Sequence, residues 1–314
     1  MARPFDHILI IADIEGSSGC WNYRASKFLT DEWSQACVEM TLDVAAVVRG
    51  LFDAGVEKVT VKDFHRTGYN LLPEMIHPLA RIVLGYRQGP VPGLGNPGDA
   101  KAVMFLGMHA ASGTEGFMAH TLTSRIIWLE VNRRPLAEVE LFSASLAPYG
   151  IRPVFFSGCP TACAQAQAAI ARINSYPIDK SHGPALFDAQ TWRSGLVKGA
   201  LESLNNLDTE PYAMSGPFRA EVTMWDGQKS ASKLAHWWGF DHEGGRIFIE
   251  TADIHELYSD LIRLCYLTPL TAKTLPWGLF LYNFTGRLGL EWVRWRQRPV
   301  IQRYKLAGNK ENNK

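Results

Sequence analysis

A buried strand that ends in two acidic residues is the feature that most constrains this chain. Residues 8–12 form an apolar run typical of a buried β-strand, and Asp13 and Glu15 follow it directly, before a glycine-rich turn at 16–19. In an open α/β sheet, ligands collect just beyond the carboxyl ends of the strands. Two carboxylates at such a place stay ionised only when a cation or a hydrogen-bond network compensates their charge. A metal ion is the simplest compensator.

The segments that follow alternate between strand and helix patterns. Thr30 is the expected cap of a long helix that ends at Gly55. Further strands are expected at 59–62, 81–84, 102–106, 125–131 and 153–157, and further helices at 136–146 and 160–173. This alternation predicts an α/β fold with a mostly parallel sheet covered by helices.

The pattern changes near residue 178, which suggests a division of the chain into three parts. We expect an α/β core at 1–178 that carries the metal-capable side chains, and a smaller α+β region at 179–270 that completes the subunit. The third part is a C-terminal extension at 271–314, whose polar end at 309–314 is predicted to be disordered.

Composition excludes several classes of protein. The hydrophobic content of 46% is sufficient for a well-buried core. A net charge of +1 lacks the excess of positive charge that is typical of nucleic-acid-binding proteins. The N-terminal residues show no secretory segment, so we expect the five cysteines to be reduced thiols in a cytoplasmic protein.

Metal-capable side chains follow several of the expected strands, at the point where each strand ends. They are Asp13 and Glu15 after the first strand, His65 after the second, His109 after the strand at 102–106, and Glu138 at the start of the next helix. Because the tips of parallel strands meet at one edge of a sheet, these groups are expected to converge. Three carboxylates and two imidazoles suit divalent ions, zinc first and manganese or cobalt next. With a bridging Asp, five ligands fit two ions about 3.5–4 Å apart.

Each of these residues, taken alone, also has an ordinary structural interpretation. Asp13 is as well placed to cap a turn as to bind a metal. A single buried histidine such as His109 is more often hydrogen-bonded within the core, and an acid such as Glu138 is more often a solvated helix residue. Their coincidence at successive strand ends is what favours a site.

Five motifs, in this order, resemble those of the bacterial D-aminopeptidases typified by DppA. They are Ala-Asp-Ile-Glu-Gly-Ser-Ser-Gly at 12–19, Val-Lys-Asp-Phe-His at 61–65, Phe-Leu-Gly-Met-His-Ala at 105–110, Gly-Phe-Met-Ala-His-Thr at 116–121 and Asn-Arg-Arg-Pro-Leu-Ala-Glu at 132–138. The resemblance covers residues 6–175 well and 210–270 weakly.

The resemblance implies a hydrolase with two zinc ions per subunit that releases N-terminal D-amino acids from short peptides or amides through a metal-bound hydroxide. It also implies a homo-oligomeric ring, which in this family is a decamer. By this resemblance Asp13 bridges both ions, Glu15 and His65 complete one coordination shell, and His109 and Glu138 complete the other.

His120 falls where the family has its catalytic histidine. It is expected to lie outside the metal shell, either as an acid or base or as a nucleophile. The alternative is a loop histidine hydrogen-bonded to Thr121 or Thr123.

The chain departs from the family pattern close to these residues. The departures are Ala111, Glu140, Phe142 and the pair Cys159-Pro160. They leave the expected ligands intact and open the question of substrate specificity. Two other functions therefore stay open: a metal-dependent hydrolase of another small amide or ester, and a non-catalytic assembly or binding protein on the same fold.

The C-terminal extension has no counterpart in that resemblance. Its aromatic and basic residues are Trp277, Phe280, Tyr282, Phe284, Trp292 and Trp295, with Arg287, Arg294, Arg296 and Arg298. Pro276 and Pro299 bracket this segment, and three glycines are expected to weaken a continuous helix. An arm that packs on a ring neighbour is the favoured interpretation, ahead of peripheral contact with a membrane.

Overall fold

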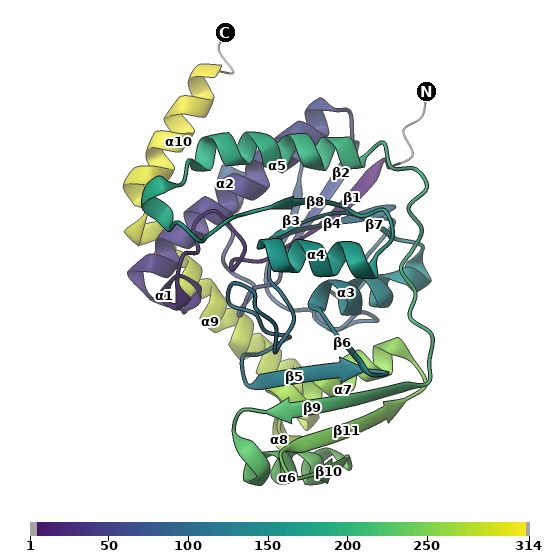
Figure 1. Cartoon of the computed structure of the whole chain (residues 1–314). Coiled ribbons are helices and arrows are strands. Elements are labelled where there is room, and N and C mark those ends of the chain that lie inside the picture. Colours follow the sequence, from purple (N-terminus) through teal and green to yellow (C-terminus); the bar gives the residue numbers. More distant parts are fainter. Residues whose placement is uncertain (1–4, 312–314) are drawn as a thin grey trace.

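A six-stranded parallel sheet forms the centre of the molecule. The computed structural model describes residues 5–311, with side chains to residue 306. The sheet order is β3-β2-β1-β4-β7-β8 (Figure 1). Its strands are β1 (His7–Ala12), β2 (Lys58–Asp63), β3 (Arg81–Val83), β4 (Ala102–Met108), β7 (Arg152–Gly158) and β8 (Asn174–Pro177). The α/β class predicted from the sequence is confirmed.

The first strand and the first long helix form as expected from the sequence. All six residues of β1 are buried, because helices cover both faces of the sheet and leave no solvent-facing side. Helix α2 (Asp31–Asp53) follows the short helix α1 (Tyr23–Ser26). The Thr30 side chain accepts a hydrogen bond from the Trp33 N–H and so caps α2.

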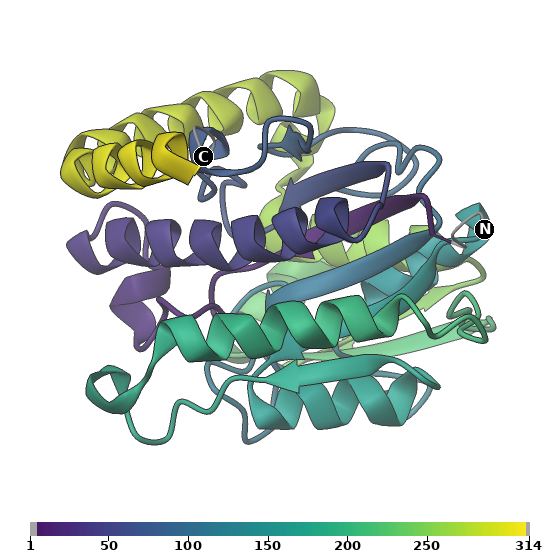
Figure 2. The same ribbon diagram turned by 90° about the horizontal axis from the view of Figure 1, so that it is seen from above.

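Two hydrophobic cores lie on opposite faces of the parallel sheet (Figure 2). Ile8 and Ile10 of β1 point into the core shared with α2 and with α5 (Ala189–Ser203). Leu9 and Ile11 point into the other core. That core contains residues of α3 (Glu138–Leu146), α4 (Pro160–Ala169) and α7 (Ile254–Tyr266).

A second, antiparallel sheet lies beyond α3 and α7. Its order is β10-β11-β9-β5-β6. The strands are β5 (Ile126–Val131), β6 (Arg134–Pro135), β9 (Phe218–Met224), β10 (Asp241–Glu243) and β11 (Arg246–Thr251), and α6 (Gly227–Trp238) packs against β9 and β11.

The strand expected at 125–131 is present, but it lies outside the parallel sheet. This segment is β5, and it pairs antiparallel with β9. Ile126, Leu129 and Val131 are buried, whereas Ile127 is exposed, which is typical of a strand with only one covered face. The second sheet takes strands from both sides of residue 178, while the division into 1–178, 179–270 and 271–314 stays a prediction.

The extension is more regular than expected. It forms α8 (Pro269–Lys273), α9 (Leu275–Arg296) and α10 (Arg298–Glu311). Gly286 and Gly289 do not break α9, because they lie on its inner face, where a Cβ would collide with the rings of Tyr69 and Phe28. The predicted disorder at 309–314 is wrong for 309–311, which are helical, and 312–314 lie outside the described residues.

Helix α9 packs on the core of its own subunit. Trp292 stacks on Trp33 with the ring centroids 6.0 Å apart. The Arg294 guanidinium donates to both carboxylate oxygens of Glu74 at 2.9 Å. Within residues 5–311, no helix combines the length and the hydropathy that crossing a bilayer requires.

Lys62 is a charged residue at the centre of the fold. It lies on β2, is fully buried, and donates to the Gly85 carbonyl. Its ammonium lies 4.9 Å from the centroid of the Tyr86 ring. Burial lowers the pKa of Lys62 to about 7.

Replacing Lys62 by Met is expected to flatten the pH dependence of stability. Since the pKa falls from 10.5 in the unfolded chain to about 7 in the fold, the unfolded chain binds more protons between these values, and stability rises with pH there. The contribution to the slope is at most about 1.4 kcal/mol per pH unit. Urea unfolding of the wild type and of Lys62→Met at pH 7.5 and 9 measures it. Lys101→Met, an exposed control, is expected to keep the wild-type slope, and an unchanged slope in Lys62→Met contradicts the assignment.

Candidate metal centre

The loop after β1 packs closely against the carboxyl end of β4. The Gly16 N–H donates to the Gly107 carbonyl at 2.7 Å, and the Asp13 N–H donates to the Leu106 carbonyl at 2.8 Å. Gly107 has a φ of 74°, and a Cβ there would collide with the Asp13 carbonyl. The glycines therefore allow the acidic loop after β1 to lie against the histidine that follows β4.

Asp13 lies between two histidines. Its Oδ1 is 3.1 Å from Nδ1 of His65, and its Oδ2 is 3.3 Å from Nε2 of His109. Glu15 Oε2 lies 3.0 Å from the same His65 nitrogen, and Glu138 Oε2 lies 3.5 Å from the same His109 nitrogen. The structure thus brings together all five residues that the sequence suggested as ligands, and all five are buried.

Backbone carbonyls orient both imidazoles. His65 Nε2 lies 2.9 Å from the Ser26 carbonyl, and His109 Nδ1 lies 3.2 Å from the Ala110 carbonyl. Because a carbonyl oxygen only accepts, these nitrogens carry the N–H. In the neutral rings, the other nitrogens direct their lone pairs at carboxylates. This arrangement requires a positive charge, which is supplied by a second ring proton or by a metal ion.

The pKa shifts of Asp13, His65 and His109 all favour the charged forms. Burial opposes charge on His65, but the Glu15 and Asp13 carboxylates outweigh burial and raise its pKa to about 10. The pKa of His109 is likewise raised, against burial, by Glu138 and Asp13. Burial raises the pKa of Asp13, yet the two histidines outweigh it and hold that pKa well below its usual range. The electrostatics favour ionised acids around a cation.

Two buried atoms test whether the residues fit a metal. Within the described residues, Glu15 Oε2 and His109 Nε2 have no hydrogen-bond partner. Their short contacts to His65 and Asp13 lack the alignment of hydrogen bonds, as expected of ligand atoms that face a common ion rather than each other. Nitrogen and carboxylate donors without thiolate suit zinc, manganese or cobalt. The residues fit divalent metal ions.

Asp63 and Asn70 hold the loop that carries His65. One Asp63 carboxylate oxygen accepts from the backbone N–H of Asn70 at 2.5 Å and of Leu71 at 2.9 Å. The Asn70 amide donates to Asp63 at 2.8 Å and to the His65 carbonyl at 2.7 Å. Asp63 Oδ1 also accepts from the His65 backbone N–H at 3.3 Å, so Asp63 fixes the turn through backbone and amide contacts.

Lys180 is a residue of the site that sequence reasoning missed. Its ammonium donates to the backbone carbonyls of Glu15 at 3.0 Å and Ser17 at 2.7 Å, and also to that of Cys20. It comes from the segment after β8, which carries no strand or helix pattern in the sequence. Burial lowers the pKa of Lys180 to about 8. No local motif could have revealed this contact, since it depends on the sheet order β1-β4-β7-β8.

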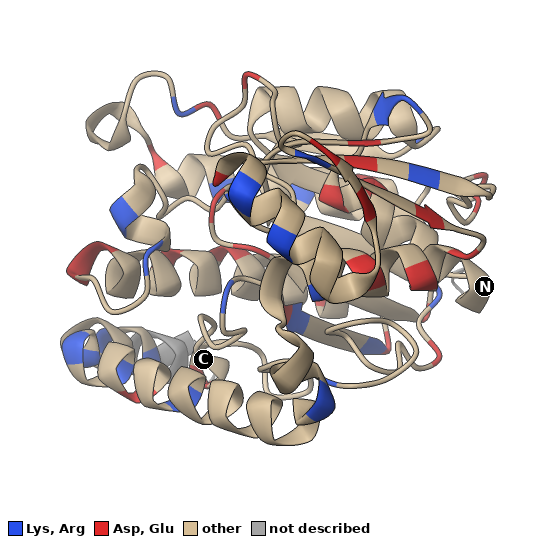
Figure 3. Cartoon of the chain, turned by 90° about the horizontal axis from the view of Figure 1, so that it is seen from below, with Lys and Arg blue, Asp and Glu red and all other residues tan. Residues whose placement is uncertain are grey.

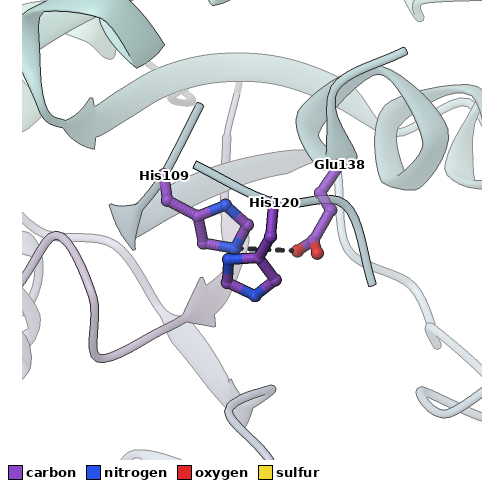
Figure 4. A group of neighbouring side chains, drawn as sticks. All are labelled: His109, His120 and Glu138. Atoms are coloured by element: carbon purple, nitrogen blue, oxygen red, sulfur yellow. Dashed lines mark ion pairs between the residues drawn. The ribbon is translucent and has the colours of Figure 1, made fainter. Parts of the chain in front are cut away.

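His120 lies directly against His109, as Figure 4 shows. The two rings stack with centroids 3.7 Å apart and planes 11° apart. His120 Nδ1 lies 2.8 Å from the Met118 carbonyl and not against Thr121 or Thr123, so the alternative hydrogen-bond partners are wrong. Its N–H is thereby assigned to Nδ1, which leaves a lone pair on Nε2.

The surroundings of His120 keep its ring neutral. Burial, and next the neighbouring His109, lower the pKa of His120. A neutral imidazole can accept a proton or bind a metal ion. Ligand atoms of His109, His120 and Glu138 lie within 4.8 Å of one another, and those of Asp13, Glu15 and His65 form a second such group. The geometry therefore allows both a catalytic and a ligand role for His120.

Comparison with known proteins identifies relatives of this chain. A solved structure, the Zn-dependent D-aminopeptidase DppA from Bacillus subtilis, described as a self-compartmentalizing protease, superposes with a TM-score of 0.76. The match has 20% sequence identity and covers 83% of this chain and 97% of that one. It shows that the two proteins share a fold.

Sequence comparisons agree with the structural match. A D-aminopeptidase of Bacillus subtilis (strain 168) is 25% identical over 166 residues. That alignment covers 52% of this chain and 56% of the relative, so the chain matches about half of the relative's length. The family described as D-aminopeptidase, peptidase M55, matches residues 7–261, which contain every residue of the metal cluster. The chain belongs to the D-aminopeptidase family.

Proposed function

We propose that this protein is a binuclear zinc-dependent aminopeptidase that releases N-terminal D-amino acids from short peptides or amides. The observation that carries the proposal is the position of Asp13, whose two carboxylate oxygens each face a different histidine nitrogen. A carboxylate placed in this way suits a bridge between two ions. Family membership supports the peptidase chemistry.

The ligands divide into two sets around this bridge. In the proposal Glu15 and His65 hold one ion, and His109 and Glu138 hold the other, each set together with Asp13. When bound, such ions polarise the scissile carbonyl and provide a hydroxide nucleophile at neutral pH. The Ser26 and Ala110 carbonyls fix the ring orientations in advance, so the site requires little rearrangement to bind metal.

His120 is proposed to move a proton during hydrolysis. Its ring is neutral, its Nε2 carries the lone pair, and the Met118 carbonyl fixes its orientation. Such a base can take a proton during attack on the peptide carbonyl and return it to the leaving amine. His120 also lies on a glycine-rich loop, apart from the strand ends and from the start of α3 that carry the five proposed ligands.

A second candidate is a hydrolase of another small amide or ester that uses the same ligands. The aromatic surroundings of the cluster favour it as the alternative. Phe142 packs on Phe64, with centroids 4.8 Å apart, and lies 5.8 Å from Tyr258. Phe142 stands at one of the positions where this chain departs from the family pattern, which leaves the substrate class open although the proposed ligands are retained.

Assembly and location are part of the same proposal. The solved relative is called self-compartmentalizing, which supports a homo-oligomeric ring for this chain, with a decamer as the proposed size. All five cysteines are free and buried, which supports the proposal of a reducing, cytoplasmic location.

Asp13→Ala is expected to weaken both zinc sites, because each ion loses the shared ligand. We expect the affinity for each of the two zinc ions to fall by more than about 100-fold. Removing a residue that only hydrogen-bonds to a metal ligand costs less than this. Glu15→Ala, by contrast, is expected to weaken one equivalent and spare the other. Titration calorimetry with chelator-buffered zinc and elemental analysis measure these values. Glu115→Ala, an exposed acid in a nearby loop, is the control and should bind two zinc ions. Two tightly bound ions in Asp13→Ala would refute the bridge.

His120→Asn is expected to reduce the turnover number while the protein keeps its zinc. Loss of an acid or base lowers kcat by about 10²–10⁴-fold, with little change in KM when the group does not bind the ground state. Steady-state kinetics on D-alanyl and L-alanyl p-nitroanilide, with metal analysis of the same samples, give both values. Loss of one zinc equivalent in the variant would make His120 a ligand instead. Two bound ions without turnover of either anilide by the wild type would favour the second candidate function.

A further inference from the structure

An uncovered apolar stripe runs along the outside of α9. Its residues recur at intervals of three, four or seven along the helix and therefore share one face. They are Trp277, Phe280, Leu281, Phe284, Leu288 and Trp295, with exposed fractions of 73%, 60%, 61%, 50%, 56% and 68%. From Trp277 to Trp295 the stripe spans about 27 Å, at 1.5 Å per residue.

The opposite face of α9 holds this stripe outward. Gly286, Gly289, Leu290 and Val293 are buried against the subunit core. Asn283 is fixed to the Tyr86 backbone, accepting from its N–H at 2.9 Å and donating to its carbonyl at 3.1 Å. Helix α9 therefore cannot rotate to bury the stripe without breaking its own packing. The helix lies along an outer edge of the subunit (Figure 2).

Basic side chains surround the stripe. Between residues 269 and 306 the basic residues are Lys273, Arg287, Arg294, Arg296, Arg298, Arg303 and Lys305, and the only acidic residue is Glu291. Arg294 pairs with Glu74 and Glu291, and Arg296 pairs with Asp31. Across the described part of the chain, Lys273, Arg287 and Arg298 form no ion pair, so their charge remains available. Figure 3 shows blue bands on α9 and α10 with few red ones.

We infer that this face of α9 docks onto an anionic phospholipid bilayer. An exposed stripe of Trp, Phe and Leu flanked by Arg and Lys is typical of a helix that lies in the plane of a membrane surface. The aromatic rings enter the interface, and the cations contact the lipid phosphates. The helix does not cross the bilayer, since no helix of the described chain meets that requirement.

Charge argues against an isologous contact in which the α9 faces of two copies meet. A symmetric contact between two copies would place the same basic flanks against each other, which is repulsive. An anionic surface instead complements them. The membrane proposal therefore differs from the sequence-based interpretation, which favoured an arm that packs on a neighbouring subunit.

The proposed docking surface also lies outside the part of the chain that matches the family. The family match ends at residue 261, before α9 begins. The structural match covers 97% of the solved relative but only 83% of this chain, so this chain has residues without a counterpart in that structure. The surface is thus an addition to the peptidase core, and its function goes beyond hydrolysis.

Vesicle co-sedimentation of the full chain tests the inference. The wild type is expected to pellet with phosphatidylglycerol–phosphatidylcholine vesicles, to release at high salt, and to bind pure phosphatidylcholine at least about tenfold more weakly. The triple variant Phe280→Gln, Phe284→Gln and Leu288→Gln removes apolar contact and is expected to lose about tenfold or more in partitioning. Lys273→Glu with Arg298→Glu is expected to weaken binding to the anionic vesicles.

Matched controls keep the test decisive. Trp225→Gln removes an exposed aromatic residue, 75% exposed, that lies outside α9, and should pellet like the wild type. Circular dichroism and thermal melting establish that each variant is folded. Equal pelleting of the wild type and the triple variant, absence of pelleting, or equal binding to neutral vesicles would overturn the inference. A triple variant that changes oligomer size in sedimentation velocity but keeps vesicle binding would also overturn it and assign the stripe to an interface between copies.

Discussion

The site depends on the orientation of the His65 and His109 rings. In each ring one nitrogen donates to a backbone carbonyl, and the other nitrogen faces a carboxylate. In the neutral rings that other nitrogen therefore directs a lone pair at Asp13. Buried anions and lone pairs in contact require positive charge. Divalent ions held by these groups, as we propose, would supply that charge, and membership of the D-aminopeptidase family supports peptidase chemistry.

The fold creates this arrangement by bringing together four distant segments. Parallel strands β1, β2 and β4 present Asp13, His65 and His109 at one edge, because β1 lies between the other two. The close approach of the loop after β1 to the end of β4 requires glycine at 16 and 107, where a Cβ would meet backbone atoms. Lys180 then holds the acidic loop from outside, through three carbonyls. Catalytic geometry here is a consequence of strand order.

The sequence predicted those features that depend on local pattern. The buried strand at 8–12 and the Thr30 cap follow from short-range chemistry, and the five side chains suggested as ligands do lie together, while their metal-binding role stays a prediction. The sequence could not predict Lys180, since nothing near residue 180 indicates that β8 ends beside β1 loop carbonyls. The strand expected at 125–131 formed, but the sequence does not specify whether its partner is β9 or a parallel neighbour. Gly286 and Gly289 suggested a broken helix, whereas their role is close packing on Tyr69 and Phe28, a contact between segments over 200 residues apart.

The most direct test of the central claim is zinc X-ray absorption spectroscopy on the metal-loaded protein. Two ions bridged by Asp13 predict nitrogen and oxygen ligands at about 2.0–2.2 Å and a metal–metal vector of about 3.5–4 Å. The metal–metal feature should disappear in Asp13→Ala. A single isolated zinc, or a sulfur shell near 2.3 Å that would indicate cysteine ligands, would contradict the account.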